Sequence, residues 1–507
     1  MKPLAATVVF AFVASLLATP AVRRLAKQFG LLDRPDKHRK LHAESIPLGG
    51  GVAILIALLT TILFVVTYSH SQAAASADNR SFLIGLLAAA SLICIVGLLD
   101  DCYSLRGRQK LLGQILAASI LCYSGLVIHR IEWLGIRTEL GPLAYPFTVF
   151  WILGAINAFN LLDGIDGLAA TVGIIISTGI SALAFLTGHP TEAFVALAMA
   201  GAIGGFLVYN RPPATIFMGD AGSMLIGLVL GALAIRASLK QFSSVSLIVP
   251  IAIWALPIFD VSMAILRRRL TGRSIYTTDR GHIHHLLQQR GLSVREVVAL
   301  IGSLCAVTVT GGVLTMYSSH DGFAYAAIVL ACGFLVVSRL FGHREARLLV
   351  SRLQSSFRSL LPTEAVNDEK PQPKGTHLSG TREWNELWTT LREFAEDFDL
   401  NSIQLNVHSP SMGEEWHAVW DRKMPANDLH LWHAEIPLVA GAITVGRLKI
   451  TGVRAEGNFC LWMSELIAGL EPFEVQLIQL IESEPTRLHP LPGQSRTQVN
   501  LARIQNA

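Results

Sequence analysis

Two aspartates lie within an otherwise apolar stretch, and their surroundings indicate the chemistry they could serve. Asp163 and Asp166 stand in FNLLDGIDGLAA, each followed by glycine, and Asn160 precedes them. Carboxylate and amide oxygens are the ligands that hard divalent cations such as magnesium prefer, and magnesium commonly holds substrate phosphates as well. The glycines allow close backbone approach. The stretch is therefore a candidate for metal-assisted phosphate chemistry.

Three further polar clusters accompany this stretch. LLDDCYSLRGRQK carries Asp100 and Asp101, with Lys110 nine residues after the second acid. Asp220 lies in IFMGDAGS, and three histidines follow in DRGHIHH. Lysine and arginine-rich loops suit phosphate groups. The clusters together predict a site for a pyrophosphate bound to magnesium, where a phosphorylated lipid meets a soluble nucleotide.

Each cluster taken alone has a simpler explanation. A single aspartate at a helix boundary is more often a solvated cap, Asp163 and Asp166 could be turn residues, and the histidines could form a solvated basic face. These explanations account poorly for so many acids and amides on one side of the protein. Acids in or beside membrane segments are costly and usually functional.

The elements that position these residues are predicted to be membrane helices. Of the 507 residues, 51% are apolar and only 15% are charged, which is typical of a polytopic membrane protein. Apolar runs of roughly 17 to 22 residues are each long enough to cross a hydrocarbon core as a helix. The eleven predicted spans lie at about 4–22, 48–68, 82–99, 111–128, 143–160, 167–187, 191–209, 221–236, 243–265, 297–317 and 322–340.

The distribution of lysine and arginine predicts the orientation of these spans. The loops after alternate spans, beginning with the first, are rich in basic residues, whereas the loops on the other side hold few. Basic residues near helix ends are retained on the cytoplasmic side. We therefore expect an outside N-terminus and an inside C-terminus. All four polar clusters then fall on the cytoplasmic side, and the apolar centres of the spans are expected to be free of acids.

The expected fold class is an all-α polytopic membrane protein of about eleven transmembrane helices, with a small C-terminal cytoplasmic α/β domain. The tail shows no metal, phosphate or nucleophile pattern, so a regulatory or structural role is expected for it. We expect helices near 382–398 and 459–482 and strands near 402–408, 414–421, 430–438 and 443–451. The predicted divisions are a transmembrane catalytic domain (1–345), a linker (346–381), an α/β accessory domain (382–483) and a disordered tail (484–507).

The glycines of RKLHAESIPLGGG, residues 39–51, could be mistaken for a phosphate-binding loop. No GK[ST] ending follows them, which such a loop requires. We expect helix packing or loop closure to explain these glycines.

The motifs, in this order, resemble those of the polyprenyl-phosphate N-acetylhexosamine-1-phosphate transferases, glycosyltransferase family 4. The resemblance covers about residues 20–345, and GRSIYTTDRGHIHH is most similar to the bacterial undecaprenyl-phosphate N-acetylglucosamine-1-phosphate transferases. The muramoyl-pentapeptide branch of peptidoglycan synthesis is the neighbouring alternative. The resemblance implies transfer of a sugar 1-phosphate from a UDP-sugar to undecaprenyl phosphate, which releases UMP. It also implies the bacterial cytoplasmic (inner) membrane and the first membrane step of cell-surface polysaccharide synthesis.

The resemblance assigns roles by position. Asn160 and Asp220 match the metal ligands, for Mg²⁺ with Mn²⁺ as the alternative. Asp100 matches the acid that deprotonates or orients the lipid phosphate, Asp101 its partner near the metal, and Lys110 the lysine that holds the acceptor phosphate. Spacing leaves open which aspartate acts as base, and positioning with charge neutralisation should carry most of phosphoryl transfer. The substrate-binding residues implied are Asp163, Asp166, Arg280, His282, His284 and His285.

Two other classes of protein are alternatives. A cation transporter would place acids deep within interrupted spans, and a membrane sensor would use the tail as its output. The expected partners are a UDP-N-acetylhexosamine, undecaprenyl phosphate and the lipid bilayer, with no nucleic acid. A homodimer is common in related folds.

Overall fold

The protein divides into two compact units, Met1–Leu349 and Val350–Ala507. The computed structural model describes residues 2–33, 45–68, 77–133, 136–238, 244–270, 281–343, 345–347, 349–350, 376–379, 382–409, 414–422, 431–440, 443–453 and 459–482. Most of the predicted linker and all of the predicted disordered tail lie outside these residues.

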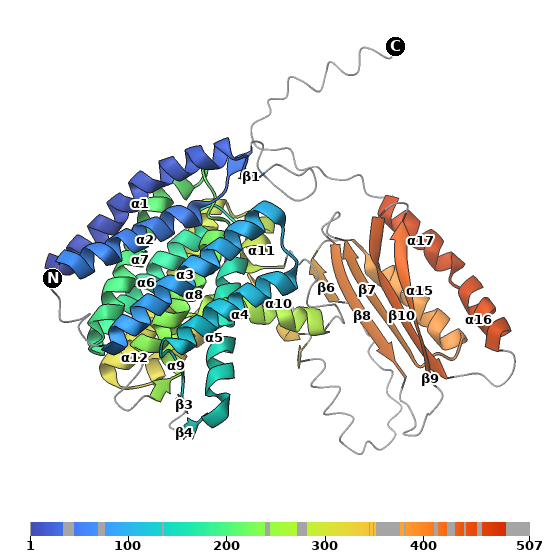
Figure 1. Ribbon diagram of the computed structural model, residues 1–507. Helices are drawn as coiled ribbons and strands as arrows, with labels where there is room; N and C mark the ends of the chain where they lie inside the picture. The colour runs from blue at the N-terminus through green and yellow to red at the C-terminus, as the bar shows by residue number, and fades with distance from the viewer. Residues whose placement is uncertain are drawn as a thin grey trace, which may run out of the picture. The chain divides into compact units, whose positions relative to one another are not determined.

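The first unit is a bundle of apolar helices (Figure 1). Among the described residues, eight helices are long and apolar enough to cross a membrane. The chain therefore reads as a multi-pass membrane protein. The helices of this unit are α1 (Lys2–Gln28), α2 (Gly50–Tyr68), α3 (Ala77–Tyr103), α4 (Gly107–Tyr123), α5 (Ala144–Leu162), α6 (Leu168–Leu186), α7 (Pro190–Asn210), α8 (Gly219–Ala237), α9 (Ile248–Ile253), α10 (Ala255–Leu270), α11 (Ile283–Gln289), α12 (Val294–Ser318) and α13 (Gly322–Val337).

Three of the eleven predicted spans are not among these eight helices: the runs at 111–128 and 322–340 form α4 and α13, of 17 and 16 residues, and the third run is divided. The apolar run at 243–265 was expected to form one helix, but α9 ends at Ile253 and α10 begins at Ala255. Hydrophobicity alone could not reveal this interruption, because the residues on both sides of it are apolar. The run is therefore two shorter helices, and neither is long enough alone to count as a membrane span.

Helix α8 is the centre of the bundle. Of its most apolar window, 94% is buried inside the protein, as expected for a helix that is apolar on all sides. Two of its glycines face α5: a Cβ at Gly227 would lie 2.7 Å from Ile156 Cα, and one at Gly231 would lie 2.6 Å from Ala155 Cβ. Small residues let membrane helices approach closely. This close approach brings the C-terminal end of α5 beside the N-terminal end of α8.

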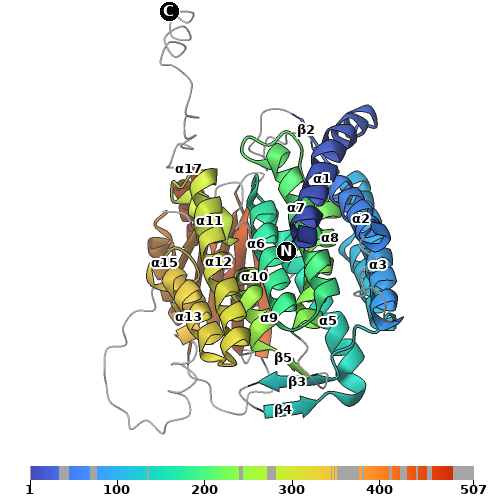
Figure 2. The same ribbon diagram turned by 90° about the vertical axis from the view of Figure 1, so that its left-hand side faces the viewer.

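Short strands mark the two ends of the bundle (Figure 2). At one end β1 (Leu32–Asp33) pairs antiparallel with β2 (Ile46–Pro47), and α11 lies at the same end. At the other end β3 (Arg130–Trp133) pairs antiparallel with β4 (Ile136–Glu139) and parallel with β5 (Ser244–Ser246). The 3₁₀ helix η2 (Gly141–Leu143) leads from these strands into α5.

The second unit contains a five-stranded antiparallel sheet in the order β6-β8-β7-β10-β9. Its helix α15 (Trp384–Asp397) presents Trp384, Trp388 and Leu391 to a hydrophobic core shared with the sheet. The other elements are β6 (Thr376–Ser379), β7 (Ser402–Ser409), β8 (Glu414–Asp421), β9 (Leu431–Ala440), β10 (Ile443–Val453), α16 (Phe459–Ala468) and α17 (Glu471–Glu482). Strand β6 falls where a linker was expected, and the helix predicted at 459–482 is two helices.

Candidate active site

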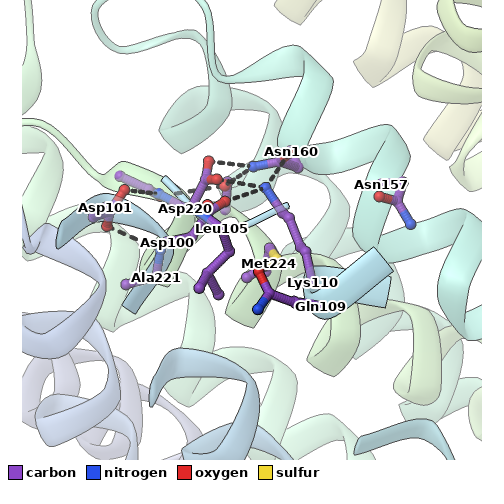
Figure 3. A network of polar contacts seen from close by, with 12 residues as sticks. Asp100, Asp101, Leu105, Gln109, Lys110, Asn157, Asn160, Asp220, Ala221 and Met224 are labelled. Atoms are coloured by element: carbon purple, nitrogen blue, oxygen red, sulfur yellow. Dashed lines mark hydrogen bonds and ion pairs between the residues drawn. The ribbon is translucent and has the colours of Figure 1, made fainter. Parts of the chain in front are cut away.

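Four helix ends bring polar side chains together around one ammonium group (Figure 3). Lys110, in the first turn of α4, forms an ion pair with Asp100 of α3, 2.9 Å from Nζ to Oδ2. Its Nζ also donates to Asp220 of α8, and to the amide oxygen of Asn160 of α5 at 3.3 Å. Oxygen atoms from three other helices therefore converge on a single cation position.

The amide of Asn160 is oriented by its own hydrogen bonds. Its Nδ2 donates to Asp220 Oδ1 at 2.7 Å and to Ser223 Oγ at 2.8 Å. Ser223 is fully buried one turn after Asp220 on α8. Because the nitrogen has two acceptors, the amide oxygen of Asn160 is turned toward Lys110.

Below this network, an amide pair ties α4 to α5. Gln114 Nε2 donates to Asn157 Oδ1 at 3.2 Å, and Asn157 Nδ2 donates to Gln114 Oε1 at 2.9 Å. Gln114 lies one turn beyond Lys110, and Asn157 one turn before Asn160. This part-buried pair sets the register in which Lys110 meets Asn160. The sequence analysis missed Gln114, although its spacing of four from Lys110 places both residues on one face of a helix.

Asp101 is bound to the N-terminus of α8. Its Oδ1 accepts a hydrogen bond from the backbone N–H of Asp220 at 2.9 Å, and its Oδ2 accepts one from that of Ala221 at 3.3 Å. Figure 3 shows Asp100 and Asp101 serving different partners, Lys110 and the α8 backbone respectively.

The glycines at the start of α2 pack against the same end of α8. The N–H groups of Gly50 and Gly51 donate to the carbonyls of Phe217 and Met218, both at 3.0 Å. A Cβ at Gly51 would lie 2.2 Å from the nitrogen of Gly222. Helix packing, as expected from the sequence, accounts for these glycines.

A cavity of about 670 Å³ opens beside the network. Such a volume suits a small-molecule ligand. Burial, together with the negative charges of Asp220, Asp101 and Asp166, raises the pKa of the Asp163 carboxyl to about 8. Without a neighbouring cation, that carboxyl is therefore mostly protonated at neutral pH. The predicted site residues that line the cavity are Asp100, Asp101, Asp163, Asp166, Asp220 and His285.

Asp166 lines the cavity and also holds a neighbouring loop. Its Oδ2 accepts from the backbone N–H of Ala214 at 2.9 Å. Nearby, Gly167 starts α6 with a φ of +76° and donates its N–H to Asn210 Oδ1 at 3.0 Å. The second glycine of DGIDG thus provides the left-handed backbone that this turn needs.

The histidine segment is anchored by an acid that the sequence analysis did not identify. Asp260 of α10 is 2% exposed. Its Oδ2 lies 2.9 Å from His282 Nδ1, and its Oδ1 accepts from the N–H of Ile283 at 2.9 Å. Asp260 lies toward the C-terminal end of the run at 243–265 rather than at its centre. A carboxylate within an apolar run was the available signal.

The three histidines occupy different environments. His285 lines the cavity, whereas His284 is 1% exposed and lies against Gly164, where a Cβ would come within 2.1 Å of its Nε2. Within the part of the chain that the structure describes, neither ring nitrogen of His284 has a hydrogen-bond partner. Burial, reinforced by His285, lowers the pKa of His284 to about 3, so its ring is neutral at physiological pH. Arg280, also predicted to bind substrate, lies outside the described residues.

A buried ion pair holds the start of the histidine segment. Arg267 Nη1 lies 2.8 Å from Glu345 Oε1, and its Nη2 donates to the carbonyl of Gly281 at 2.9 Å. The side chains of Arg267 and Glu345 are only 2% and 3% exposed. Arg267 is therefore a buried structural residue.

The oxygen ligands at this site are of the kind that magnesium binds. Among the described residues, no three histidine, cysteine, aspartate or glutamate side chains form a ready metal cage. The oxygens of Asp100, Asn160 and Asp220 nevertheless converge on the Lys110 ammonium. Magnesium keeps few protein ligands and takes others from water and substrate phosphates. The residues therefore fit a magnesium ion that is shared with its substrates.

The sequence is similar to that of known proteins. The family model of glycosyl transferase family 4 matches residues 83–238, which run from α3 to α8. A Bacillus subtilis protein described as a probable undecaprenyl-phosphate N-acetylglucosaminyl 1-phosphate transferase is 37% identical over 310 residues, 59% of this chain and 84% of the relative. The chain belongs to glycosyl transferase family 4.

Other members of the family are similar over the same extent. The undecaprenyl-phosphate alpha-N-acetylglucosaminyl 1-phosphate transferase of Escherichia coli K12 is 29% identical over 331 residues, 63% of this chain and 85% of the relative. The decaprenyl-phosphate N-acetylglucosaminephosphotransferase of Mycolicibacterium smegmatis is 32% identical over 348 residues, 62% of this chain and 83% of the relative.

Proposed function

We propose that this protein transfers N-acetylglucosamine 1-phosphate from its UDP-sugar to undecaprenyl phosphate. The products are the undecaprenyl-diphosphate sugar and UMP. The observation that carries the proposal is the convergence of Asp100, Asn160 and Asp220 on Lys110 at the edge of the cavity. The names of the family members described above support both the sugar and the polyprenyl phosphate.

In this reaction an oxygen of the acceptor phosphate attacks the phosphorus that carries the sugar. The bond from that phosphorus to the oxygen bridging it to UMP breaks, and the electron pair leaves with UMP. Asn160 and Asp220 would hold magnesium, which supplies neutralisation of negative charge on the phosphates. Lys110 contacts the same oxygens, and its ammonium would bind the acceptor phosphate. Asp100 holds Lys110 in place from the other side.

We propose that the UDP-sugar binds on the side of the cavity that carries Asp163, Asp166 and His285. A neutral His284 beneath Gly164 adds no charge to this side of the cavity, and the Asp260–His282 contact fixes the backbone that carries His285. We place the cavity at the cytoplasmic face of the bacterial inner membrane, because the basic loops fall on the side of the catalytic helix ends. In this orientation, β3, β4 and β5 lie at the outer end of the bundle.

Substitution of Asp220 tests the function. Purified full-length protein should release UMP from UDP-N-acetylglucosamine only when undecaprenyl phosphate and magnesium are both present. Asp220→Ala should reduce that rate at least about a thousandfold, because it removes a ligand and a partner of Lys110. Glu139→Gln, an exposed change on β4 at the other end of the bundle, is the matched control. Full turnover by Asp220→Ala would refute the assignment.

A donor panel separates the two branches of the family. Three UDP-sugars, each radiolabelled in its sugar, would be tested: UDP-N-acetylglucosamine, UDP-N-acetylgalactosamine and UDP-muramoyl-pentapeptide. Label should enter the lipid extract from the first donor. Label from the muramoyl-pentapeptide donor alone would move the protein to peptidoglycan synthesis.

A further inference from the structure

The carboxylate of Asp101 serves as a helix cap supplied from another helix. It accepts from the N–H groups of Asp220 and Ala221, at 2.9 and 3.3 Å, in the first turn of α8. The residue at the N-cap position of α8, Met218, makes no side-chain cap hydrogen bond. The first N–H groups of a helix have no partner within it and are normally satisfied by a polar N-cap side chain. A side chain of α3 therefore does for α8 what its own N-cap residue cannot.

The two helices carry glycine where this contact is made. A Cβ at Gly219 would lie 2.4 Å from Asp101 Oδ2, and Gly219 has a φ of +71°. On α3, a Cβ at Gly97 would lie 2.5 Å from Ala221 Cα. The carboxylate reaches the backbone of α8 only because both side chains are absent. Any larger residue at Gly219 would push Asp101 from its two N–H donors.

The capped turn is the turn that carries Asp220. One of the two N–H groups held by Asp101 belongs to Asp220 itself. The direction of the Asp220 carboxylate depends on its own backbone, so a displaced cap would misdirect its oxygens away from Asn160 and Lys110. Each carboxylate oxygen of Asp101 accepts a hydrogen bond from one backbone N–H of α8.

We propose that Asp101 is a positioning residue, which together with Gly219 fixes the first turn of α8 and thereby aims Asp220 at the metal. In this role Asp101 neither takes a proton from the acceptor nor ligates the metal. The inference rests on the proposed function, since it assigns a task within the same site. It also separates two neighbouring aspartates that the sequence alone treats as a pair.

The test measures metal affinity and turnover separately, in full-length protein in nanodiscs. Manganese binding is followed by electron paramagnetic resonance, and kcat is measured at saturating metal. Asp101→Asn keeps one acceptor and should weaken manganese binding about threefold, whereas Asp101→Ala and Gly219→Ala should each weaken it about tenfold or more. In all three, kcat at saturating manganese should stay within about fivefold of the wild type. Gly154→Ala, on α5 with no atom within 4 Å of the new Cβ, should change neither quantity.

Each alternative role of Asp101 gives a different pattern. A base would make Asp101→Asn and Asp101→Ala inactive at every manganese concentration, with normal metal affinity. A direct ligand would make Asp101→Asn lose at least as much manganese affinity as Gly219→Ala, because the amide removes the ligand's charge whereas the glycine change keeps the carboxylate. Either pattern overturns the proposal, and Gly219→Ala with Asp101→Asn decides the matter if Asp101→Ala does not fold. If Asp220→Ala binds manganese as the wild type does, the metal site of the proposed function fails, which is a separate result.

Discussion

The two sides of the cavity are built in different ways. On the acidic side, the helices meet backbone to backbone: Gly51 and Gly97 pack onto the first turn of α8, and Asp101 binds its N–H groups. On the histidine side, the segment is held by side-chain pairs, Asp260 with His282 and Arg267 with Glu345. The acidic side is therefore fixed by the packing of the membrane bundle itself.

This difference suggests a division of labour. Catalytic groups must hold their geometry closely, because small displacements cost much of the rate. Packed main chains of rigid helices provide that precision. Contacts to a soluble donor can instead be carried by a segment that side-chain pairs anchor to the bundle. Changes on the acidic side should thus affect turnover or metal affinity, and changes on the histidine side should affect binding of the UDP-sugar.

The largest effect within this comparison is expected at Asn160. Asn160→Ala removes an oxygen from the position that the cation occupies and removes a hydrogen bond to Asp220. It leaves the histidine side of the cavity, where the UDP-sugar is proposed to bind, intact. The value of kcat should fall about a hundredfold or more, with little change in KM for the UDP-sugar. Steady-state UMP release at several magnesium concentrations measures both. A large rise in KM with normal kcat would contradict the division.

Asp260→Asn is the corresponding change on the histidine side. The new amide can still accept from Ile283 but places an N–H opposite His282 Nδ1. The KM for the UDP-sugar should rise roughly tenfold, with a smaller change in kcat, because a charged hydrogen bond is lost. The same assay is the measurement, with Glu139→Gln as control. The comparison fails if Asp260→Asn lowers kcat and leaves KM unchanged.

A smaller effect, on stability, is expected from His284. The folded protein holds its pKa at about 3, whereas an unfolded histidine titrates near 6.5. The free energy of unfolding is therefore unaffected by this residue above about pH 6.5. It decreases as the pH falls toward 3, because the unfolded chain binds the proton more tightly. At pH 5 the loss should be about 2 kcal/mol. Between pH 7.5 and 5, the apparent unfolding midpoint should fall less for His284→Gln than for the wild type. The midpoint of His320→Gln, a change at an exposed histidine, should fall as much as that of the wild type. Equal decreases in the midpoints of all three proteins would refute the prediction.

The smallest effect is expected from the second unit. Its core is its own, around Trp384 and Trp416, and the family members described above match only about three-fifths of this chain. Deletion of residues 350–507 should change UMP release less than about twofold. Loss of activity in a deletion variant that still binds manganese normally would instead favour a signalling role for this unit.

Much of the site could be predicted from the sequence because its motifs combine residue type with helix ends. Asp100, Lys110, Asn160 and Asp220 meet in the structure, as the convergence of four clusters required. Asp260 was missed because it lies within an apolar run without a neighbouring polar motif. The different partners of Asp100 and Asp101 could not be predicted from the sequence. Adjacent side chains on a helix point about 100° apart, and only tertiary packing determines which groups each of them meets.

The helices were predictable for a related reason. Hydrophobic length marks where a membrane segment lies, and the predicted runs agree with the positions of the helices. Hydrophobic length does not reveal a break within an apolar run, so α9 and α10 were predicted as one helix. The small sheets at the bundle ends are set by pairing between distant loops, such as β3 with β5, which no local pattern reveals.

Manganese binding to Lys110→Met tests the central claim most directly, since Lys110 contacts the oxygens of Asn160 and Asp220 that are proposed to hold the metal. Removing its charge should tighten manganese binding about tenfold, because the ion no longer competes with an ammonium, while UMP release is lost. Metal binding that is unchanged or weaker in Lys110→Met would show that lysine and metal occupy separate positions, and would contradict the account.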